Sequence, residues 1–272
     1  MSQTVLFFGA TGGVANACLT MALKSKQYKV IALVRTPDKL RKQLIEQQKL
    51  DEATINSNLI TMPGNALKVP DVKRALLANI TSGLDETLPS MIISGLGGAP
   101  KFNFDIWHPL HFAALDQPTI CEDAAKTLTT ALKDVYNERP ALKLQKPGVC
   151  FVSTTGISRG PEDVPFFMRF LYHQLLALPH EDKKKMEEVY RGSMLESEPV
   201  LSSVTGIRPT LLSGTGALSE GVGLQKIRAG VEGKPAVGYN VQRADVGTFM
   251  FENVIRMGET GKWRGGMVSL TA

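Results

Sequence analysis

Residues 5–15 read Val-Leu-Phe-Phe-Gly-Ala-Thr-Gly-Gly-Val-Ala, and this stretch decides the fold. An apolar run of strand type leads directly into a glycine-rich turn, which opens a segment of good helix formers. In such a turn Gly9 permits the tight bend, Gly12 lets the backbone approach a pyrophosphate, and the small Ala15 lets the helix pack against the sheet. The pyrophosphate then lies on the helix N-terminus, where free N–H groups favour negative charge. The alternative is an ordinary strand-to-helix turn without a ligand. We expect a dinucleotide to be bound here by Gly9, Thr11, Gly12, Gly13 and Val14.

Outward from this turn, apolar runs of strand length alternate with segments of helical period. This alternation is typical of repeated βαβ units and a parallel sheet. The expected strands are 4–8, 30–34, 59–62, 90–94, 149–153, 204–208 and 267–270. The expected helices are 14–24, 71–78, 121–136, 182–195 and 244–257. Because the spacing is irregular and the strands are too few for a barrel, we predict one doubly wound α/β domain over residues 1–272.

Residues 99–119 and 157–179 do not fit the minimal alternation. Both leave the carboxyl ends of strands, where open α/β sheets bind their ligands, so we expect them to form the substrate site together with residues 210–242. The first two segments are rich in aromatic residues, which favours either an apolar pocket for a flat ligand or core packing and a dimer contact. These residues are Phe102, Phe104, Trp107, Phe112, Phe166, Phe167, Phe170 and Tyr172.

Composition excludes several classes of protein. Hydrophobic residues make up 43% and charged residues 21% of the 272 residues, which is the profile of a globular chain with one large core. The net charge is +5, but the basic residues are dispersed and the run 183–185 is bracketed by acidic residues, so we expect no nucleic-acid partner. No signal peptide or membrane-length apolar run is visible, which favours a cytoplasmic protein without a membrane partner. We expect a monomer or homodimer. The three cysteines lack metal-ligand spacing, and we expect no metal.

Arg35 ends the second expected strand, where a dinucleotide fold reads the adenosine ribose. An acidic side chain at this place accepts a hydrogen bond from a 2′-hydroxyl, whereas an arginine complements a 2′-phosphate. The sequence therefore favours NADP(H) over NAD(H). Lys39, Arg41 and Lys42 follow closely, and they either add positive potential or form a solvated helix face.

Two further turns belong to the expected cofactor site. Asn65 and Ala66 follow the third strand, at the point where such folds contact adenine; Asn65 offers a donor and an acceptor, but a turn-forming asparagine explains it almost as well. After the fourth strand, residues 94–99 read Ser-Gly-Leu-Gly-Gly-Ala. Gly95 is expected near the nicotinamide ribose and phosphates, and the alternative is a flexible hinge.

Several stretches together resemble the atypical short-chain dehydrogenase/reductases of the NmrA-like group, over nearly the whole chain. The segment 179–183, Pro-His-Glu-Asp-Lys, is similar to the fungal averufin-oxidase-A-like members. The resemblance implies a Rossmann-type core with a small C-terminal substrate-binding part and NADPH as the usual ligand. It implies no single reaction, since the family includes reductases, isomerases and redox-sensing regulators. The stretches that carry the resemblance are residues 9–15, Arg35, 64–66, 205–209 and 243–247.

The catalytic residues are less clearly marked. Orthodox short-chain reductases use a Tyr-x-x-x-Lys pair, and no tyrosine of this chain is followed four residues later by a lysine. By resemblance Lys183 occupies the active-site lysine position, where it would bind the nicotinamide ribose, with Pro179 in place of the tyrosine; the alternative is a solvent-facing lysine. His180 suits an acid/base role or a helix cap. Ser153 ends the fifth strand, where it either orients the substrate oxygen or satisfies backbone groups.

The leading hypothesis is an NADPH-dependent reductase that acts on a bulky, largely apolar small molecule in secondary metabolism. A second hypothesis keeps the nucleotide but assigns the site to isomerisation, cyclisation or imine chemistry. A third is a non-catalytic nucleotide sensor that binds a protein partner.

Overall fold

The computed structural model describes residues 3–81, 83, 87–98, 100–102, 113–115, 117–168 and 177–272. Much of the two expected substrate segments lies outside these ranges, including five of the aromatic residues singled out above. They are Phe104, Trp107, Phe112, Phe170 and Tyr172.

One eight-stranded sheet organises the chain, in the order β10-β12-β8-β7-β4-β1-β2-β3. All neighbours run parallel except β10, which pairs antiparallel with β12 at one edge. The chain starts in the middle with β1, builds outward through β2 and β3, and then returns to the other side of β1 with β4. This confirms the doubly wound α/β fold. The strands are β1 (Gln3–Phe8), β2 (Tyr28–Val34), β3 (Leu59–Pro63), β4 (Met91–Ser94), β7 (Gly148–Val152), β8 (Ser203–Pro209), β10 (Arg228–Val231) and β12 (Met267–Thr271).

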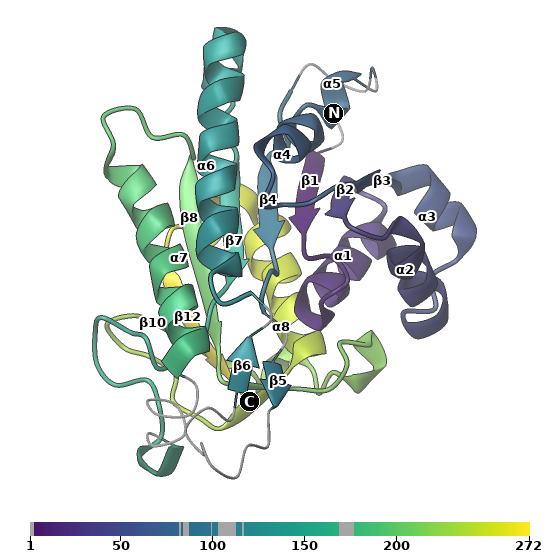
Figure 1. The fold of residues 1–272 in the computed structure, drawn as a ribbon. Coiled ribbons are helices and arrows are strands. Elements are labelled where there is room, and N and C mark those ends of the chain that lie inside the picture. The colour runs from purple at the N-terminus through teal and green to yellow at the C-terminus, as the bar shows by residue number, and fades with distance from the viewer. Residues whose placement is uncertain are drawn as a thin grey trace.

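Helices cover both faces of the sheet, so its central strands are apolar on both sides. In β1, Val5 and Phe7 belong to the core cluster on one face, and Leu6 and Phe8 to the cluster on the other. Figure 1 shows α6 and α7 together on one side of the sheet, and α1 with α8 on the other. The larger helices are α1 (Gly13–Ser25), α2 (Pro37–Lys42), α3 (Glu52–Asn58), α4 (Val69–Leu76), α6 (Ile120–Glu138), α7 (Ala177–Leu195) and α8 (Arg243–Met250).

Glycine permits the close contact between α1 and α8. A Cβ atom on Gly247 would lie 2.6 Å from the Cβ of Ala17 and 2.6 Å from the carbonyl oxygen of Val14. The Arg-Ala-Asp-Val-Gly stretch at 243–247 therefore forms the part of α8 that packs on the helix of the glycine-rich turn.

The structure corrects several expected boundaries. The helix expected over 182–195 begins five residues earlier, and the one expected over 244–257 is α8 followed by a π-helical turn, η8 (Phe251–Ile255). The sequence pattern did not predict α2, α3 or the edge strand β10. It also did not predict the remaining short elements, which carry no measurable period. They are η1 (Gln43–Gln47), α5 (Ala78–Thr81), β5 (Pro100–Phe102), β6 (Ala113–Leu115), η3 (Pro140–Leu144), η4 (Phe166–Met168), β9 (Leu211–Ser213), η6 (Leu218–Glu220), η7 (Leu224–Lys226), β11 (Asn240–Gln242) and η9 (Gly258–Thr260).

Candidate cofactor site

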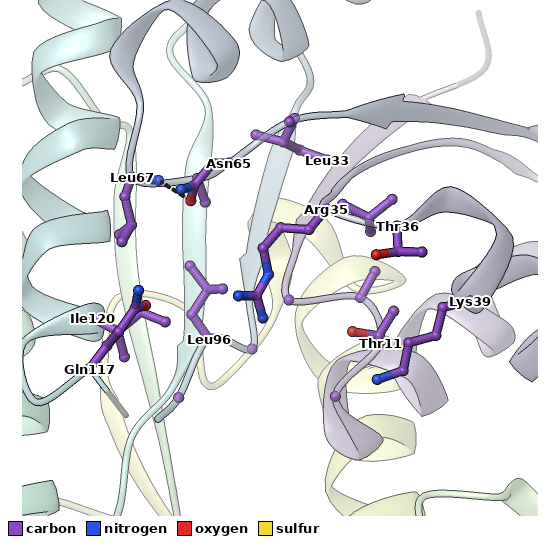
Figure 2. A pocket seen from close by; sticks show the side chains of 18 residues that line it. Thr11, Leu33, Arg35, Thr36, Lys39, Asn65, Leu67, Leu96, Gln117 and Ile120 are labelled. Carbon is purple, nitrogen blue, oxygen red and sulfur yellow. Dashed lines mark hydrogen bonds between the residues drawn. The ribbon is translucent and has the colours of Figure 1, made fainter. Parts of the chain in front are cut away.

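A pocket of about 430 Å³ opens at the carboxyl ends of β1, β2, β3 and β4 (Figure 2). Seven of the residues expected to bind the cofactor line it: Gly9, Thr11, Gly12, Arg35, Asn65, Ala66 and Gly95. Its other walls come from residues that the sequence analysis did not assign to the cofactor: Ala10, Leu33, Val34, Thr36, Lys39, Gly64, Leu67, Leu96, Gly97, Gln117 and Ile120.

Two glycine turns meet at the floor of this pocket. Gly9 has a left-handed backbone with φ of 68°, and a Cβ atom on it would lie 2.8 Å from the carbonyl carbon of Gly95. A Cβ atom on Gly95 would in turn lie 2.4 Å from the Cβ of Ala15. The turns after β1 and β4 therefore touch through glycine and α1 packs tightly beneath them, which is the role expected for Ala15.

The structure does not bring Gly13 and Val14 into the lining of the pocket. A Cβ atom on Gly13 would lie 2.5 Å from the carbonyl oxygen of Thr215, so this glycine is required for packing against the C-terminal part of the chain. Val14 is buried in the core on the α1 face. At the helix N-cap Gly12 contributes no side chain, so the first N–H groups of α1 carry no side-chain cap, as an anion site requires.

Positive charge enters the pocket from Arg35 and Lys39. Figure 2 shows the Arg35 side chain extending from the end of β2 into the pocket, and the Lys39 ammonium group turned toward Thr11. Both side chains are exposed, and neither forms an ion pair with any residue in the described part of the chain. In contrast, Arg41 binds Glu52 at 3.0 Å and Lys42 lies 3.9 Å from Glu46.

Asn65 forms a turn at the edge of the pocket. Its Oδ1 accepts a hydrogen bond from the N–H of Leu67 at 3.0 Å, and its own N–H donates to Asp71 at 2.9 Å. The turn-forming role that the sequence left open is thus present in the structure, beside the apolar side chains of Leu67, Leu96 and Ile120 (Figure 2).

Lys183 lies where the ends of β4 and β7 meet. Its Nζ donates hydrogen bonds to the carbonyl oxygens of Leu96 at 2.8 Å and Val152 at 2.7 Å. Leu96 and Gly97 line the pocket, and a Cβ atom on Gly97 would lie 3.9 Å from the same nitrogen. Lys183 is therefore held beside the cofactor pocket, and the alternative of a solvent-facing lysine is wrong.

The residues around Lys183 connect α7 to α6. His180 is buried near the start of α7. The carboxylate of Asp182 accepts hydrogen bonds from the N–H groups of Cys121 at 3.1 Å and Glu122 at 2.9 Å, so it caps α6 from the neighbouring helix. Burial raises the pKa of the Cys121 thiol to about 11, which makes it a poor nucleophile. This cap could not be predicted from the sequence, because Asp182 is about sixty positions from Cys121 and Glu122.

Ser153 is buried at the end of a cluster of charged side chains. Its hydroxyl donates to Glu187 at 2.6 Å, and Glu187 also accepts two hydrogen bonds from Arg208, at 2.9 and 2.5 Å. Arg208 is 2.9 Å from Glu232, which in turn accepts from Arg191 at 2.8 Å. We call Glu187, Arg191, Arg208 and Glu232 the ion cluster. The Ser153 hydroxyl therefore uses its one proton in the hydrogen bond to the Glu187 carboxylate.

A further carboxyl group lies near the ion cluster. Asp163 is 1% exposed, its Oδ1 accepts the N–H of Gly156 at 2.8 Å, and its Oδ2 has no hydrogen-bond partner among the described residues. Burial raises the pKa of Asp163, although the Gly156 N–H and the charge of Arg208 oppose the shift. Burial is the largest of these effects, so Asp163 keeps its proton to higher pH than an ordinary aspartic acid.

None of the helices within the described ranges has the length and hydropathy needed to cross a bilayer. Within the same ranges, no three His, Cys, Asp or Glu side chains lie close enough together to hold a metal ion.

Two fungal proteins resemble this chain over almost its whole length. A reductase, pytE, from Aspergillus terreus is 37% identical over 271 residues, covering 98% of this chain and 97% of its own. An oxidase, pynE, from Aspergillus niger is 38% identical over 286 residues, covering 98% of each chain. No family model matches the sequence.

Solved structures share the fold at low sequence identity. A short-chain dehydrogenase/reductase from Veillonella parvula in complex with NADP has a TM-score of 0.62 at 14% identity, covering 100% of this chain and 95% of its own. The anaerobillin reductase ChuY from Escherichia coli O157:H7 has a TM-score of 0.59 at 19% identity, covering 98% and 96%. The chain thus has the Rossmann-type fold of short-chain dehydrogenase/reductases.

Proposed function

The chain belongs to the family that includes the fungal reductase pytE and the oxidase pynE, and from this premise we propose that it is an NADPH-dependent oxidoreductase. The general class, oxidoreductase, is supported by these two relatives, a reductase and an oxidase. The pocket supports the choice of cofactor: Arg35, which forms no ion pair with a described residue, extends into it from the end of β2, opposite the glycine turn that opens α1. Arg35 is the single observation that carries the preference for NADP(H), because an exposed guanidinium at this place complements a 2′-phosphate.

The residues present fit a dinucleotide. Added Cβ atoms on Gly9 and Gly95 would meet neighbouring backbone or side-chain atoms, so both glycines keep the turn close to the pocket floor. The N-terminus of α1 has no side-chain cap, which supports binding of the pyrophosphate by its free N–H groups. When bound, NADPH supplies a hydride. We assign its binding to Gly9, Thr11, Gly12, Arg35, Asn65, Ala66, Gly95 and Lys183.

The side chains at the ends of β4 and β7 supply binding and proton chemistry. Lys183, fixed by two carbonyl groups, places a positive charge beside the pocket and stabilises developing negative charge on a substrate oxygen. Ser153 donates to Glu187, so it orients the substrate through its oxygen lone pairs. We propose His180 as the acid, since a protonated imidazole can donate a proton to a substrate oxygen.

The substrate is proposed to be a bulky, largely apolar small molecule of secondary metabolism, as the resemblance to NmrA-like fungal proteins implies. Of the aromatic residues expected in its walls, Phe166 and Phe167 lie in η4, where their rings pack edge to face at 5.6 Å and are exposed. Because the rings of this pair are exposed, they do not serve core packing and are available to an apolar ligand or to a dimer contact.

One observation favours a second candidate. Pro179 lies one turn before Lys183 on α7, so the position that holds the tyrosine of the usual Tyr-x-x-x-Lys pair carries no phenol. A non-redox reaction in the same pocket would form product without any loss of nicotinamide absorbance, whereas a reductase consumes one NADPH for each product molecule.

The test is a calorimetric titration with NADPH and with NADH on wild type, Arg35→Glu and the control Arg41→Glu. Arg41 lies nearby in the sequence, on α2, but it binds Glu52 and does not line the pocket. We expect Arg35→Glu to weaken NADPH binding by about 1–3 kcal/mol, the value of a charge-assisted hydrogen bond, and to leave NADH binding nearly unchanged. The control should bind NADPH like wild type. Failure of the wild type to bind either nucleotide would withdraw the cofactor and every role assigned around it.

A further inference from the structure

Three glutamines form a contact between the glycine turn and the C-terminal part of the chain. They lie on η1, a π-helical turn directly after α2, and on the residue that follows it. Gln43 donates from Nε2 to the carbonyl oxygen of Thr11 at 3.2 Å, and Gln47 donates to Oγ1 of Thr215 at 2.9 Å. π-helical turns are rare, and they occur frequently at functional sites.

Gln48 is the buried member of this group. It is 3% exposed, and its Nε2 donates to Oδ1 of Asn16 and to the carbonyl oxygen of Gly216, both at 2.8 Å. Its Oε1 accepts the N–H of Leu218 at 3.1 Å. Asn16, 2% exposed, donates from Nδ2 to the carbonyl oxygen of Ala10 at 3.0 Å. Two buried amides therefore connect the glycine turn to residues 216–218, and a satisfied buried network of this kind is rigid.

The segment 214–218 also rests directly on the glycine turn. Gly216 has a left-handed backbone with φ of 96°, and a Cβ atom on it would lie 2.3 Å from the carbonyl oxygen of Gly13. The carboxylate of Glu220 accepts the N–H groups of Thr215 at 2.6 Å and Gly216 at 3.2 Å, which holds the segment in this bent form. The segment therefore packs closely against the glycine turn.

We propose that Gln48 and Asn16 are positioning residues that couple nucleotide binding at the glycine turn to the segment 214–218. This segment lies within the region 210–242 that is expected to contact substrate. A nucleotide that binds the N–H groups of the turn also restricts the movement of the Ala10 carbonyl. The side-chain amides of Asn16 and Gln48 connect this carbonyl to Gly216 and Leu218, so these two residues become less mobile as well. The coupling is reciprocal, so an ordered segment also strengthens nucleotide binding. The inference rests on the proposed nucleotide site.

The test is hydrogen exchange measured by mass spectrometry on the full chain, with NADPH as the probe. In wild type, NADPH should slow the exchange of amides 214–218 by about tenfold, a typical coupling between sites. Gln48→Glu has the same shape but cannot donate to Asn16 or Gly216, so in this variant the NADPH-dependent slowing should disappear while NADPH still binds. Glu46→Gln, on the exposed side of the same turn, is the matched control and should keep the slowing.

Slowing that persists in Gln48→Glu overturns the proposal, as does wild type that binds NADPH without slowing at 214–218. A purely structural role for Gln48 would raise exchange with and without NADPH equally, so it would leave the difference unchanged. If wild type binds no NADPH, the proposed function itself fails. The link is then tested without nucleotide, where Gln48→Leu must raise exchange at both residues 9–16 and 214–218; an increase on one side alone refutes it.

Discussion

Replacing Glu187 by glutamine would remove one charge from the centre of the ion cluster without changing its shape. Arg208 is 2% exposed and the Glu187 side chain 5% exposed, so neither group is compensated by water. Breaking such a buried pair from one side costs about 3–5 kcal/mol, because a buried charge remains. Here Arg208 keeps Glu232 at 2.9 Å, which places the expected loss near the lower limit, at about 3 kcal/mol.

The same geometry predicts a smaller effect at the outer end of the cluster. The Glu232 side chain is 23% exposed, and Glu232→Gln leaves the two hydrogen bonds between Glu187 and Arg208 in place. Solvent also screens this position, so we expect a loss of about 1 kcal/mol. Glu187→Gln should therefore destabilise the fold by about three times as much as Glu232→Gln.

Urea unfolding of the two variants measures both losses, and a thermal scan should show a decrease of about 6–12 °C for Glu187→Gln. A double-mutant cycle with Arg208→Met isolates the pair, and Lys126→Met, which removes an exposed partner of Glu122, serves as the surface control with a change under about 1 kcal/mol. Equal losses for Glu187→Gln and Glu232→Gln would refute the reasoning, since burial would then not set the cost.

Two more variants probe the site. Because burial raises the pKa of Asp163, the folded state holds this proton to higher pH than the unfolded chain does, and wild type loses stability as pH rises from the ordinary aspartate range through the raised pKa. Asp163→Asn stays neutral, so urea unfolding across pH should show its stability relative to wild type increasing with pH; a constant difference contradicts this. Gly95→Ala places a Cβ 2.4 Å from that of Ala15 and should cost about 1–3 kcal/mol and weaken NADPH binding. Its control, Gly192→Ala on α7, has open space and should stabilise by about 0.5–1 kcal/mol, and equal effects would show that the close approach at Gly95 is relaxed at no cost.

The parts of the fold that could be predicted from sequence are those encoded locally. Each central strand is a continuous apolar run because it is buried on both faces. The turn of residues 9–13 can be recognised because its backbone conformation and close contacts require glycine. The position of Arg35 in the pocket could be predicted as well, because β2 pairs in parallel with β1 and its end therefore lies beside the glycine turn. Seven of the expected cofactor residues consequently line one pocket.

The parts that could not be predicted depend on register and helix rotation. The contact of Glu187 with Ser153 and Arg208 is one example. It forms because β7 and β8 are neighbours in the sheet and because the face of α7 that carries Glu187 is turned toward them. Asp182 lies next to the expected lysine, yet its function is to cap a helix sixty residues away. Gly13 belongs to the motif by pattern, but its missing side chain serves contact with Thr215.

The position of β12 in the sheet has a consequence for how the protein is made. This strand, residues 267–271, lies between β8 and β10, and both neighbours are earlier in the chain. During synthesis β8 leaves the ribosome with one edge unpaired, and the antiparallel edge strand β10 has nothing to pair with until residue 271 has been translated. An open strand edge is a template for association with other chains. The nascent protein is therefore most vulnerable to aggregation in the interval between the emergence of β8 and that of β12, and a chain interrupted before residue 267 would keep that edge exposed.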